Sequence, residues 1–321
     1  MQLQLIAVAT RAPLWPAPQE ARRYSERRPG GIVARVPAPA RYRVGDFDVA
    51  IVSDGHIKLD GGAIFGLVPR LLWEPIVGKD ALDAQYRLPL ALNCMLVRRG
   101  ADVLLVETGM GNKHSAAVRE RSFPGDYGHL LDALAQLGLH PEDVTAVANT
   151  HLHADHCGWN TVRKGDELVP AFPNARYFIQ AGEYEAATHP NERTRGTYFP
   201  ENFEPLVKSG QLELVDGERE VVPGVRFLPA PGHTADHAAL VLASRGETAI
   251  YTGDLVHHAV QLERLAWIAA FDVLPLASLE TKRQLAARAI RERALLISTH
   301  SEFPGVGRLT EHDGRRTFVP E

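Results

Sequence analysis

Residues 150–156 read Thr-His-Leu-His-Ala-Asp-His, so three imidazoles and one carboxylate fall within seven positions. The apolar run 144–147 precedes this stretch and predicts a short strand that leaves its sheet near Thr150. Side chains two residues apart on an extended chain point to the same side. We therefore expect His151 and His153 to offer two ring nitrogens to one cation.

The second half of the same stretch predicts a second cation beside the first. If the chain coils into a helical turn after His153, Asp155 and His156 swing back to face that second cation. Neutral imidazoles beside a carboxylate suit borderline cations such as zinc, whereas calcium requires oxygen ligands throughout. The pattern therefore favours zinc or a related divalent ion.

Three more residues of ligand type each follow a predicted strand. His233 comes after the apolar stretch 225–228 and a Pro-Gly turn, Asp254 ends the run 250–253, and His300 ends a third apolar run. Binding residues in layered α/β folds usually lie at strand ends. We expect these residues to converge on the same site, where the two oxygens of Asp254 would bridge two cations.

The histidines are unevenly distributed along the chain. Of 14 histidines in 321 residues, three fall within 151–156, whereas the first 50 residues contain none. A single histidine at a strand end is more often a surface or hydrogen-bonded residue than a ligand. The joint pattern, however, favours a shared metal site.

The composition is that of a globular enzyme, with 45% apolar residues, 23% charged residues and a net charge of −4. No basic excess indicates nucleic-acid binding or membrane attraction. The apolar stretch 3–9 is too short to span a bilayer and makes a poor secretory signal. We expect a cytoplasmic protein in which Cys94 and Cys157 are buried thiols rather than a disulfide.

Residues 1–45 combine many prolines, glycines and arginines, which predicts an extended N-terminal arm. Residues 46–321 would then form a single catalytic domain. An arm of this kind can wrap another subunit, so we expect a homodimer, although the arm could equally be mobile.

Alternating and apolar runs predict a sheet-rich α/β fold. Asp54-Gly55 is typical of a hairpin turn, and residues 188–210 are expected to border the site. Helices are expected at 130–137 and at 279–293, the latter with Ser278 as its N-cap. Strands are expected at 47–53, 92–97, 103–107, 144–148, 177–179, 212–215, 225–228, 238–242, 248–251 and 295–297.

These motifs resemble those of the metallo-β-lactamase-fold hydrolases. The family motif H-x-H-x-D-H is complete at 151–156, and its later His, Asp and His are matched by His233, Asp254 and His300. The segments 158–160, 253–255 and 303–307 are similar to the branch that holds quorum-quenching lactonases and methyl parathion hydrolase. The resemblance covers roughly residues 45–320 and implies a four-layer αββα sandwich.

The resemblance also implies a cofactor of two divalent metal ions, zinc first, with manganese, cobalt or iron as alternatives. A hydroxide that bridges the two ions would open a lactone or an ester, because metal coordination lowers the pKa of water from about 15.7 to about 7. The implied ligands are His151, His153 and His233 on one ion, Asp155, His156 and His300 on the other, and Asp254 between them.

The candidate catalytic residues are Asp155, Asp254 and His257. The last of these departs from the family pattern. Related lactonases often carry a tyrosine three residues after the bridging aspartate, where this chain has His257. That histidine would donate a proton or hydrogen bond to the developing oxyanion, or would simply line the pocket. Candidate substrate contacts are Trp159, Phe199, His258 and Trp267, and residues that would either orient ligands or only cap turns are Asp54, Thr150, Asp236 and His237.

Three functions follow for a small-molecule substrate. The first is a lactonase, with N-acyl homoserine lactones as the type substrate. The second keeps the hydrolase chemistry but acts on an organophosphate triester, an aryl ester or a β-lactam. The third is a non-heme iron oxidoreductase or dioxygenase on the same scaffold, against which stands His156, since a single-iron dioxygenase does not need it as a ligand.

Overall fold

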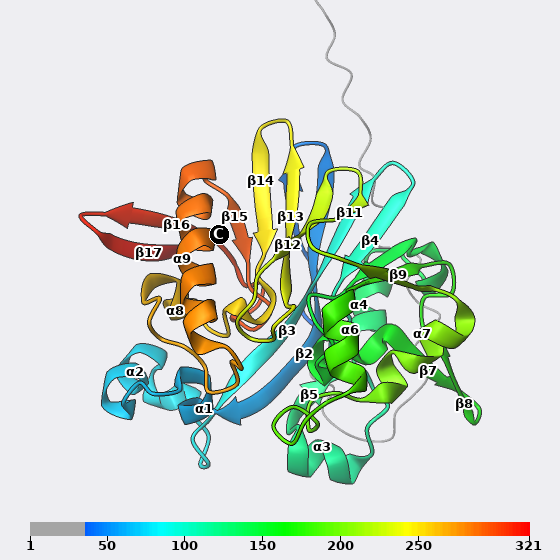
Figure 1. The fold of residues 1–321 in the computed structure, drawn as a ribbon, viewed down its shortest axis with the longest axis horizontal. Coiled ribbons are helices and arrows are strands. Elements are labelled where there is room, and N and C mark those ends of the chain that lie inside the picture. The colour runs from blue at the N-terminus through cyan, green and yellow to red at the C-terminus, as the bar shows by residue number, and fades with distance from the viewer. Residues whose placement is uncertain (1–35) are drawn as a thin grey trace, which may run out of the picture.

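The computed structural model describes residues 36–321, and two β-sheets packed face to face form its centre (Figure 1). Helices cover the outer side of each sheet, so the layers run helix, sheet, sheet, helix. This architecture confirms the four-layer αββα sandwich. Residues 1–35, which include most of the predicted arm, lie outside the described residues.

The first sheet has the order β1-β2-β3-β4-β6-β9-β10, with β5 paired to β2, and the second runs in sequence order from β11 to β17. The first contains β1 (Ala40–Val44), β2 (Phe47–Asp60), β3 (Arg87–Arg99), β4 (Asp102–Val106), β5 (Gly125–Tyr127), β6 (Ala146–Ala148), β9 (Arg176–Gln180) and β10 (Leu212–Val215). The second contains β11 (Glu220–Val222), β12 (Val225–Pro229), β13 (Ala238–Ser244), β14 (Glu247–Tyr251), β15 (Leu295–Ile297), β16 (Val306–His312) and β17 (Arg315–Pro320). A separate hairpin joins β7 (Thr161–Lys164) and β8 (Glu167–Pro170).

The helices are mostly short. The α-helices are α1 (Gly61–Phe65), α2 (Arg70–Val77), α3 (Ala116–Ser122), α4 (Leu130–Ala135), α5 (Ala154–Cys157), α6 (Ala181–Thr188), α7 (Glu204–Ser209), α8 (Val260–Glu263) and α9 (Pro275–Glu292). Single turns of 3₁₀ helix are η2 (Lys79–Ala81), η3 (Pro141–Asp143), η4 (Gly158–Asn160), η5 (Pro200–Asn202) and η6 (Gly253–Leu255).

The central strands are buried on both faces, which explains their nearly continuous apolar runs. In β13, Leu240 and Leu242 point between the two sheets, whereas Ala239 and Val241 point toward the helices. Each large aliphatic side chain buried in this way stabilises the fold by roughly 1.5–3 kcal/mol. This double burial fixes the strand ends from which the site residues emerge.

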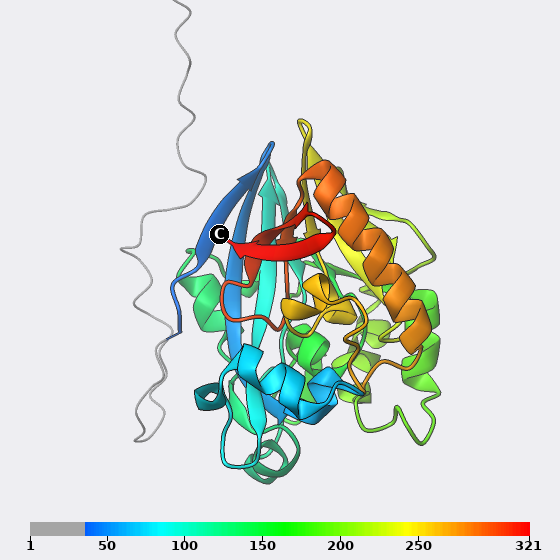
Figure 2. The same cartoon turned by 90° about the vertical axis from the view of Figure 1, so that its left-hand side faces the viewer.

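Both predicted helices form, with changed boundaries. α4 covers the first sheet, and α9 packs over the second with Leu285 and Ala286 buried (Figure 2). α9 begins at Pro275, so Ser278 lies buried inside the helix and is not its N-cap. A proline at the first helical turn loses no hydrogen bond, and this allows the earlier start.

The start of the sheet and the Asp54-Gly55 dipeptide differ from the predictions. β1 pairs with β2, so residues 40–44, which the prediction assigned to the arm, belong to the first sheet. Asp54-Gly55 forms a β-bulge within the single long strand β2 rather than a hairpin turn, because β5 pairs with the strand there. A Cβ on Gly55, whose φ is +113°, would lie 2.1 Å from the Asp126 carbonyl oxygen.

Helices α1 and α2 lie at one end of the molecule beside the ends of β2 and β3 in both views (Figures 1 and 2). Trp73 of α2 is buried and stacks on Phe65, but Leu67, Leu71 and Leu72 face outward. Among residues 36–321 no helix has the length and apolar character needed to cross a bilayer.

Candidate metal centre

The stretch 150–156 leaves β6 and turns sharply. His151 and His153 lie beyond the strand end rather than on an extended strand, yet their ring centroids are 4.5 Å apart. α5 provides the predicted helical turn that carries Asp155 and His156. The backbone of the turn is held by two buried carboxylates, which accept hydrogen bonds from the amides of Thr150 (Glu107, 2.8 Å) and Leu152 (Glu183, 3.0 Å).

The structure brings six of the seven predicted ligand side chains together in two groups of three, and the seventh, Asp254, lies between the groups. In each group three candidate ligand atoms lie within 4.8 Å of one another, the spacing of donors around one ion. The first triad is His151, His153 and His233, and the second triad is Asp155, His156 and His300.

Asp254 stands between the two triads and divides its oxygens between them. Its Oδ2 atom lies 3.4 Å from Nε2 of His233 and 4.0 Å from Nε2 of His151. Its Oδ1 atom lies 3.1 Å from Nε2 of His156 and 3.0 Å from Nε2 of His300. One carboxylate is therefore placed to contact a cation in either triad.

Gly253 allows this close approach. Its φ of +51° belongs to the left-handed region, and a Cβ there would lie 2.5 Å from Nε2 of His237. That same nitrogen accepts a hydrogen bond of 3.1 Å from the Asp254 amide, while Nδ1 of His237 donates to the Ala230 carbonyl. Burial lowers the pKa of His237 to about 3, so its ring is neutral and orients the Asp254 backbone.

Electrostatics within the centre couple the carboxylate to the imidazoles. Burial by itself would raise the pKa of Asp254, but the surrounding histidines, His156 and His300 first, lower it well below its usual value. Burial opposes protonation of His156, yet Asp254 and Asp155 raise its pKa well above the ordinary value. The same negative charge that would hold a proton on this ring would hold a divalent cation.

Several buried polar atoms of the centre lack a hydrogen-bond partner among residues 36–321. They are Nε2 of His151, both ring nitrogens of His156, Oδ1 of Asp254 and Oε2 of Glu107. Leaving a buried polar atom unsatisfied costs about 1–3 kcal/mol, so such clusters imply a missing partner. Nitrogen donors beside carboxylates fit divalent cations of the zinc type.

Hydrogen bonds from outside the triads orient the histidine rings. Nδ1 of His233 lies 3.1 Å from Asp272, and Nδ1 of His151 lies 3.0 Å from the Thr150 hydroxyl. Nδ1 of His300 donates to the Ala91 carbonyl at 2.8 Å. Such contacts set the tautomer that leaves Nε2 free for a metal. Thr150 and His237 thus occupy the orienting positions expected for them.

Three acidic residues that support the centre were not anticipated. Glu107 follows β4 with a φ of +63°, a costly conformation for a non-glycine residue, and its Oε2 lies 3.5 Å from Nδ1 of His156. Glu183 accepts hydrogen bonds from Thr234 and Tyr198, and Asp272 contacts His233. Only Glu107 carries a detectable signal, since an acidic residue at a strand end follows the same rule as Asp254.

Two other predicted orienting residues have different roles. Asp54 is buried and accepts hydrogen bonds from the amides of Met110, Gly111 and Leu130 and from the Trp159 indole. It thereby fixes the loop at Met110 and Gly111 beneath residues 150–156, the metal stretch of the sequence, and its hydrogen bonds go to none of the candidate ligand rings. Asp236 is exposed and packs against Gly182, because the turn after His233 carries it to the surface.

The predicted substrate contacts are divided between core and cavity. Trp159 is buried in the core under the helices of the first sheet, because its indole N–H is satisfied by Asp54. Phe199 packs against His114 and Phe123, and Trp267 packs against Phe65. None of these three aromatics lines the adjacent cavity, whereas His258 does.

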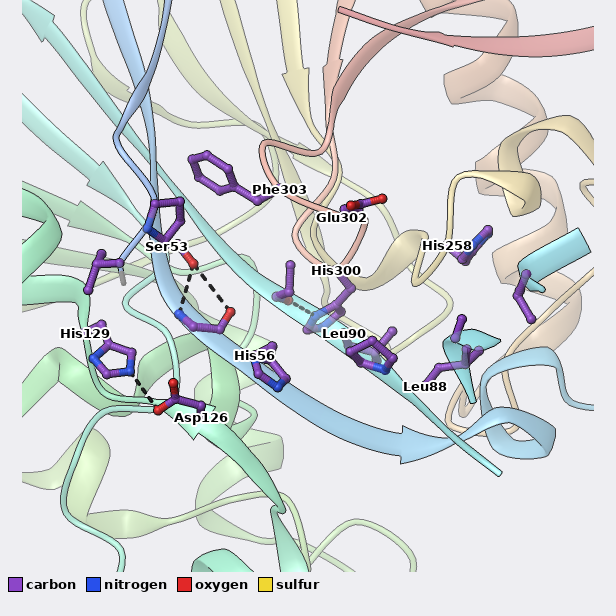
Figure 3. Close-up of a pocket in the computed structure, with 17 residues that line it drawn as sticks. Ser53, His56, Leu88, Leu90, Asp126, His129, His258, His300, Glu302 and Phe303 are labelled. Carbon is purple, nitrogen blue, oxygen red and sulfur yellow. Dashed lines mark hydrogen bonds and ion pairs between the residues drawn. The ribbon is translucent and has the colours of Figure 1, made fainter. Parts of the chain in front are cut away.

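The candidate catalytic residue His257 lies within the centre. Its Nε2 is 3.3 Å from Oδ2 of Asp254, and its ring is buried. Burial lowers the pKa of His257 against the opposing pull of Asp254, so the ring is neutral at pH 7 and can donate one hydrogen bond. Next to it, a cavity of about 520 Å³ begins at His258 and His300 (Figure 3).

Comparison with known proteins agrees with this geometry. The Metallo-beta-lactamase superfamily profile matches residues 87–301, so the chain belongs to that superfamily and is a metal-dependent hydrolase. An N-acyl homoserine lactonase of Bacillus sp is 29% identical over 227 residues, covering 66% of this chain and 82% of its own. An N-acyl homoserine lactonase of Bacillus thuringiensis is 28% identical over 234 residues, covering 69% and 85%.

Solved structures share the fold. A probable metal-dependent hydrolase from Staphylococcus aureus has a TM-score of 0.79 at 26% identity, covering 87% of this chain and 99% of its own. AidC, a dizinc quorum-quenching lactonase solved with the product N-hexanoyl-L-homoserine, has a TM-score of 0.74 at 23% identity, covering 88% and 97%. The resemblance to the lactonase branch is thereby confirmed.

Proposed function

We propose that this enzyme is a binuclear lactonase that opens N-acyl homoserine lactones or closely related lactones. The observation that carries the proposal is the placement of Asp254 between two triads of candidate ligands. The aligned region covers more than four fifths of the length of each of the two lactonase relatives, and these relatives supply the proposed substrate class.

The first triad and the second triad would each hold one divalent ion, most simply zinc. When bound, the pair would lower the pKa of a water and polarise the substrate carbonyl. Asp254 would keep the two positions at a fixed separation. His257, 3.3 Å from Asp254, would donate a hydrogen bond to the oxygen that gains charge as the ring opens.

A second candidate function is the hydrolysis of organophosphate triesters or aryl esters. It is favoured by His257, which stands where related lactonases often have tyrosine. β-Lactam hydrolysis rests on the superfamily alone.

The deciding experiment combines metal analysis with a substrate panel of acyl homoserine lactones, simple lactones, a paraoxon-type triester and nitrocefin. We expect two divalent ions per chain and the highest kcat/KM with acyl homoserine lactones. His257→Phe should lower kcat with lactones about 100-fold, the usual contribution of a proton or hydrogen-bond donor. Rapid triester turnover with inert lactones would replace the first function by the second.

We also propose a homodimer in which a second copy of the chain covers the apolar surface of α2. Leu67, Leu71, Leu72 and Ile76 are exposed there, and a contiguous apolar patch usually marks an interaction site. Light scattering of the full chain measures the mass.

The two free buried thiols, Cys94 and Cys157, support the inferred cytoplasmic location.

A further inference from the structure

His300 is attached to both sheets of the sandwich. It follows β15 of the second sheet, yet Nδ1 of its ring donates to the Ala91 carbonyl of β3 in the first sheet (Figure 3). The Ala91 amide donates to the His300 carbonyl at 3.2 Å, and the Asn93 amide donates to the Thr299 carbonyl at 3.0 Å. The position of this candidate ligand therefore depends on how the segment 298–301 is held against β3.

The buried side chain of Asn93 holds that segment on both sides of His300. Its Nδ2 atom donates hydrogen bonds to the carbonyls of Ser298 at 3.1 Å and Ser301 at 2.8 Å. The reverse orientation of the amide would place Oδ1 against two carbonyl oxygens. The orientation is therefore fixed, although Oδ1 has no hydrogen-bond partner among residues 36–321. An aspartate, whose carboxylate only accepts, could not make these two bonds.

The chain after His300 folds back over the Asn93 amide. Gly305 has a φ of +69°, and a Cβ there would lie 2.6 Å from Nδ2 of Asn93 and 2.5 Å from the Ser298 carbonyl oxygen. The Ser298 amide donates to the Gly305 carbonyl at 2.8 Å. Because only glycine leaves room at this position, the loop can close over Asn93 and keep water from its two hydrogen bonds.

The backbone of Asn93 is also bonded to the strand that leads to Asp254. The Tyr251 hydroxyl donates to the Asn93 carbonyl and accepts a hydrogen bond of 3.1 Å from the Thr299 hydroxyl. Tyr251 ends β14, three residues before Asp254. Oδ1 of Asp254 lies 3.0 Å from Nε2 of His300. Asn93 therefore lies where the strands that lead to these two residues meet.

We propose that Asn93 is a positioning residue for the second triad. By holding the segment 298–301 against β3, it directs Nε2 of His300 toward the second cation and determines the affinity for that ion. Within the described part of the chain, the hydrogen bonds of Asn93 do not reach the connections that carry the first triad, after β6 and between β12 and β13. The inference rests on the proposed binuclear centre and is independent of the substrate.

The test measures zinc affinity in two variants of the full chain. Asn93→Ser removes both amide donors, and Asn93→Asp replaces Nδ2 by an oxygen that faces two carbonyls. Titration with a competing chelator should show the second zinc ion bound about 10–100-fold more weakly, with the first nearly unchanged. Ser53→Ala is the matched control, because Ser53 is buried and pairs with Asn93 in register, but its hydroxyl contacts Gly55. It should keep both affinities.

Amide hydrogen exchange of the metal-free protein tests the attachment without any ion. The Ala91 amide, which donates to the His300 carbonyl, should exchange at least about tenfold faster in Asn93→Ser, the value of one net hydrogen bond. Amides of the β12–β13 pair should keep their rates.

The two measurements separate the outcomes. Equal weakening of both ions, or an unchanged affinity for the second ion, would overturn the positioning role of Asn93. If the unaltered chain binds fewer than two ions, the binuclear centre fails. In that case, faster Ala91 exchange in Asn93→Ser would still support the attachment of the His300 segment by Asn93. An unchanged Ala91 rate would refute that attachment in either case.

Discussion

The two triads of candidate ligands differ in what lies behind them. Behind the first triad, Asp272 contacts His233. The buried Lys282 also lies there, and burial lowers its pKa while the charge of Asp272 opposes that change. Behind the second triad, Glu107 lies 3.5 Å from His156, His300 meets a backbone carbonyl and borders the cavity, and Asp155 is partly exposed. Because His300 borders the cavity, we expect the substrate to meet the second triad and the charge of Asp272 to act mainly on a cation held by the first.

The largest effect is expected where the two positions meet. Asp254→Ala should remove the contact common to both triads and lower kcat/KM by more than about 1000-fold, well beyond the 10–100-fold typical of outer contacts. Elemental analysis of the purified variant should find fewer than two ions per chain. Two tightly held ions with full activity would show that Asp254 does not join the positions.

A smaller and one-sided effect is expected from Asp272→Asn. Loss of the charge beside His233 should weaken the first cation about 10–100-fold and leave the second nearly unchanged. Titration with a competing chelator measures the two affinities separately. Asp132→Asn, an exposed change on α4, is the matched control. Equal weakening of both positions would remove the distinction between them.

The smallest effect is expected on the pH dependence of stability, through the buried Lys282 behind the first triad. Burial lowers the pKa of Lys282 from 10.5 to about 8, so the folded protein disfavours its charged form. An unfolded chain keeps that proton up to about pH 10.4. Burial of the charged lysine therefore lowers the free energy of unfolding below pH 8. This loss of stability is relieved as the pH rises from 8 to 10.5, by on the order of 2 kcal/mol.

Lys282→Met should flatten that rise in the free energy of unfolding, as measured by urea denaturation at several pH values. Lys208→Met replaces an exposed lysine on α7 and should leave the slope unchanged. An unaltered slope in Lys282→Met would mean that this lysine does not titrate abnormally.

Much of the fold and of the candidate site was predictable because its signals are local. The metal stretch, His233, Asp254 and His300 each follow an apolar run, and strand ends meet at one edge of a sandwich. The bulge at Gly55 was not predictable, since Asp-Gly favours a turn and only the distant β5 overrides it. Asp272 was missed because no pattern connects an irregular loop with a histidine 39 residues earlier.

The aromatic residues show a second limit. Trp159 directly follows the metal stretch, which suggested a substrate contact, but proximity in sequence does not define the side of the chain that a ring faces. Its direction depends on Asp54, which lies 105 residues away. Long-range polar pairs of this kind are invisible to periodicity and composition.

The bulge in β2 has a consequence for how this enzyme can diverge. One additional residue at Gly55 reverses the alternation of the strand, so Asp54 serves the loop under the metal stretch while His56 borders the cavity. Two residues of one strand, two positions apart, thereby face different parts of the molecule. A substitution at His56 would therefore change the cavity lining while the hydrogen bonds from Asp54 to the loop at Met110 and Gly111 are kept.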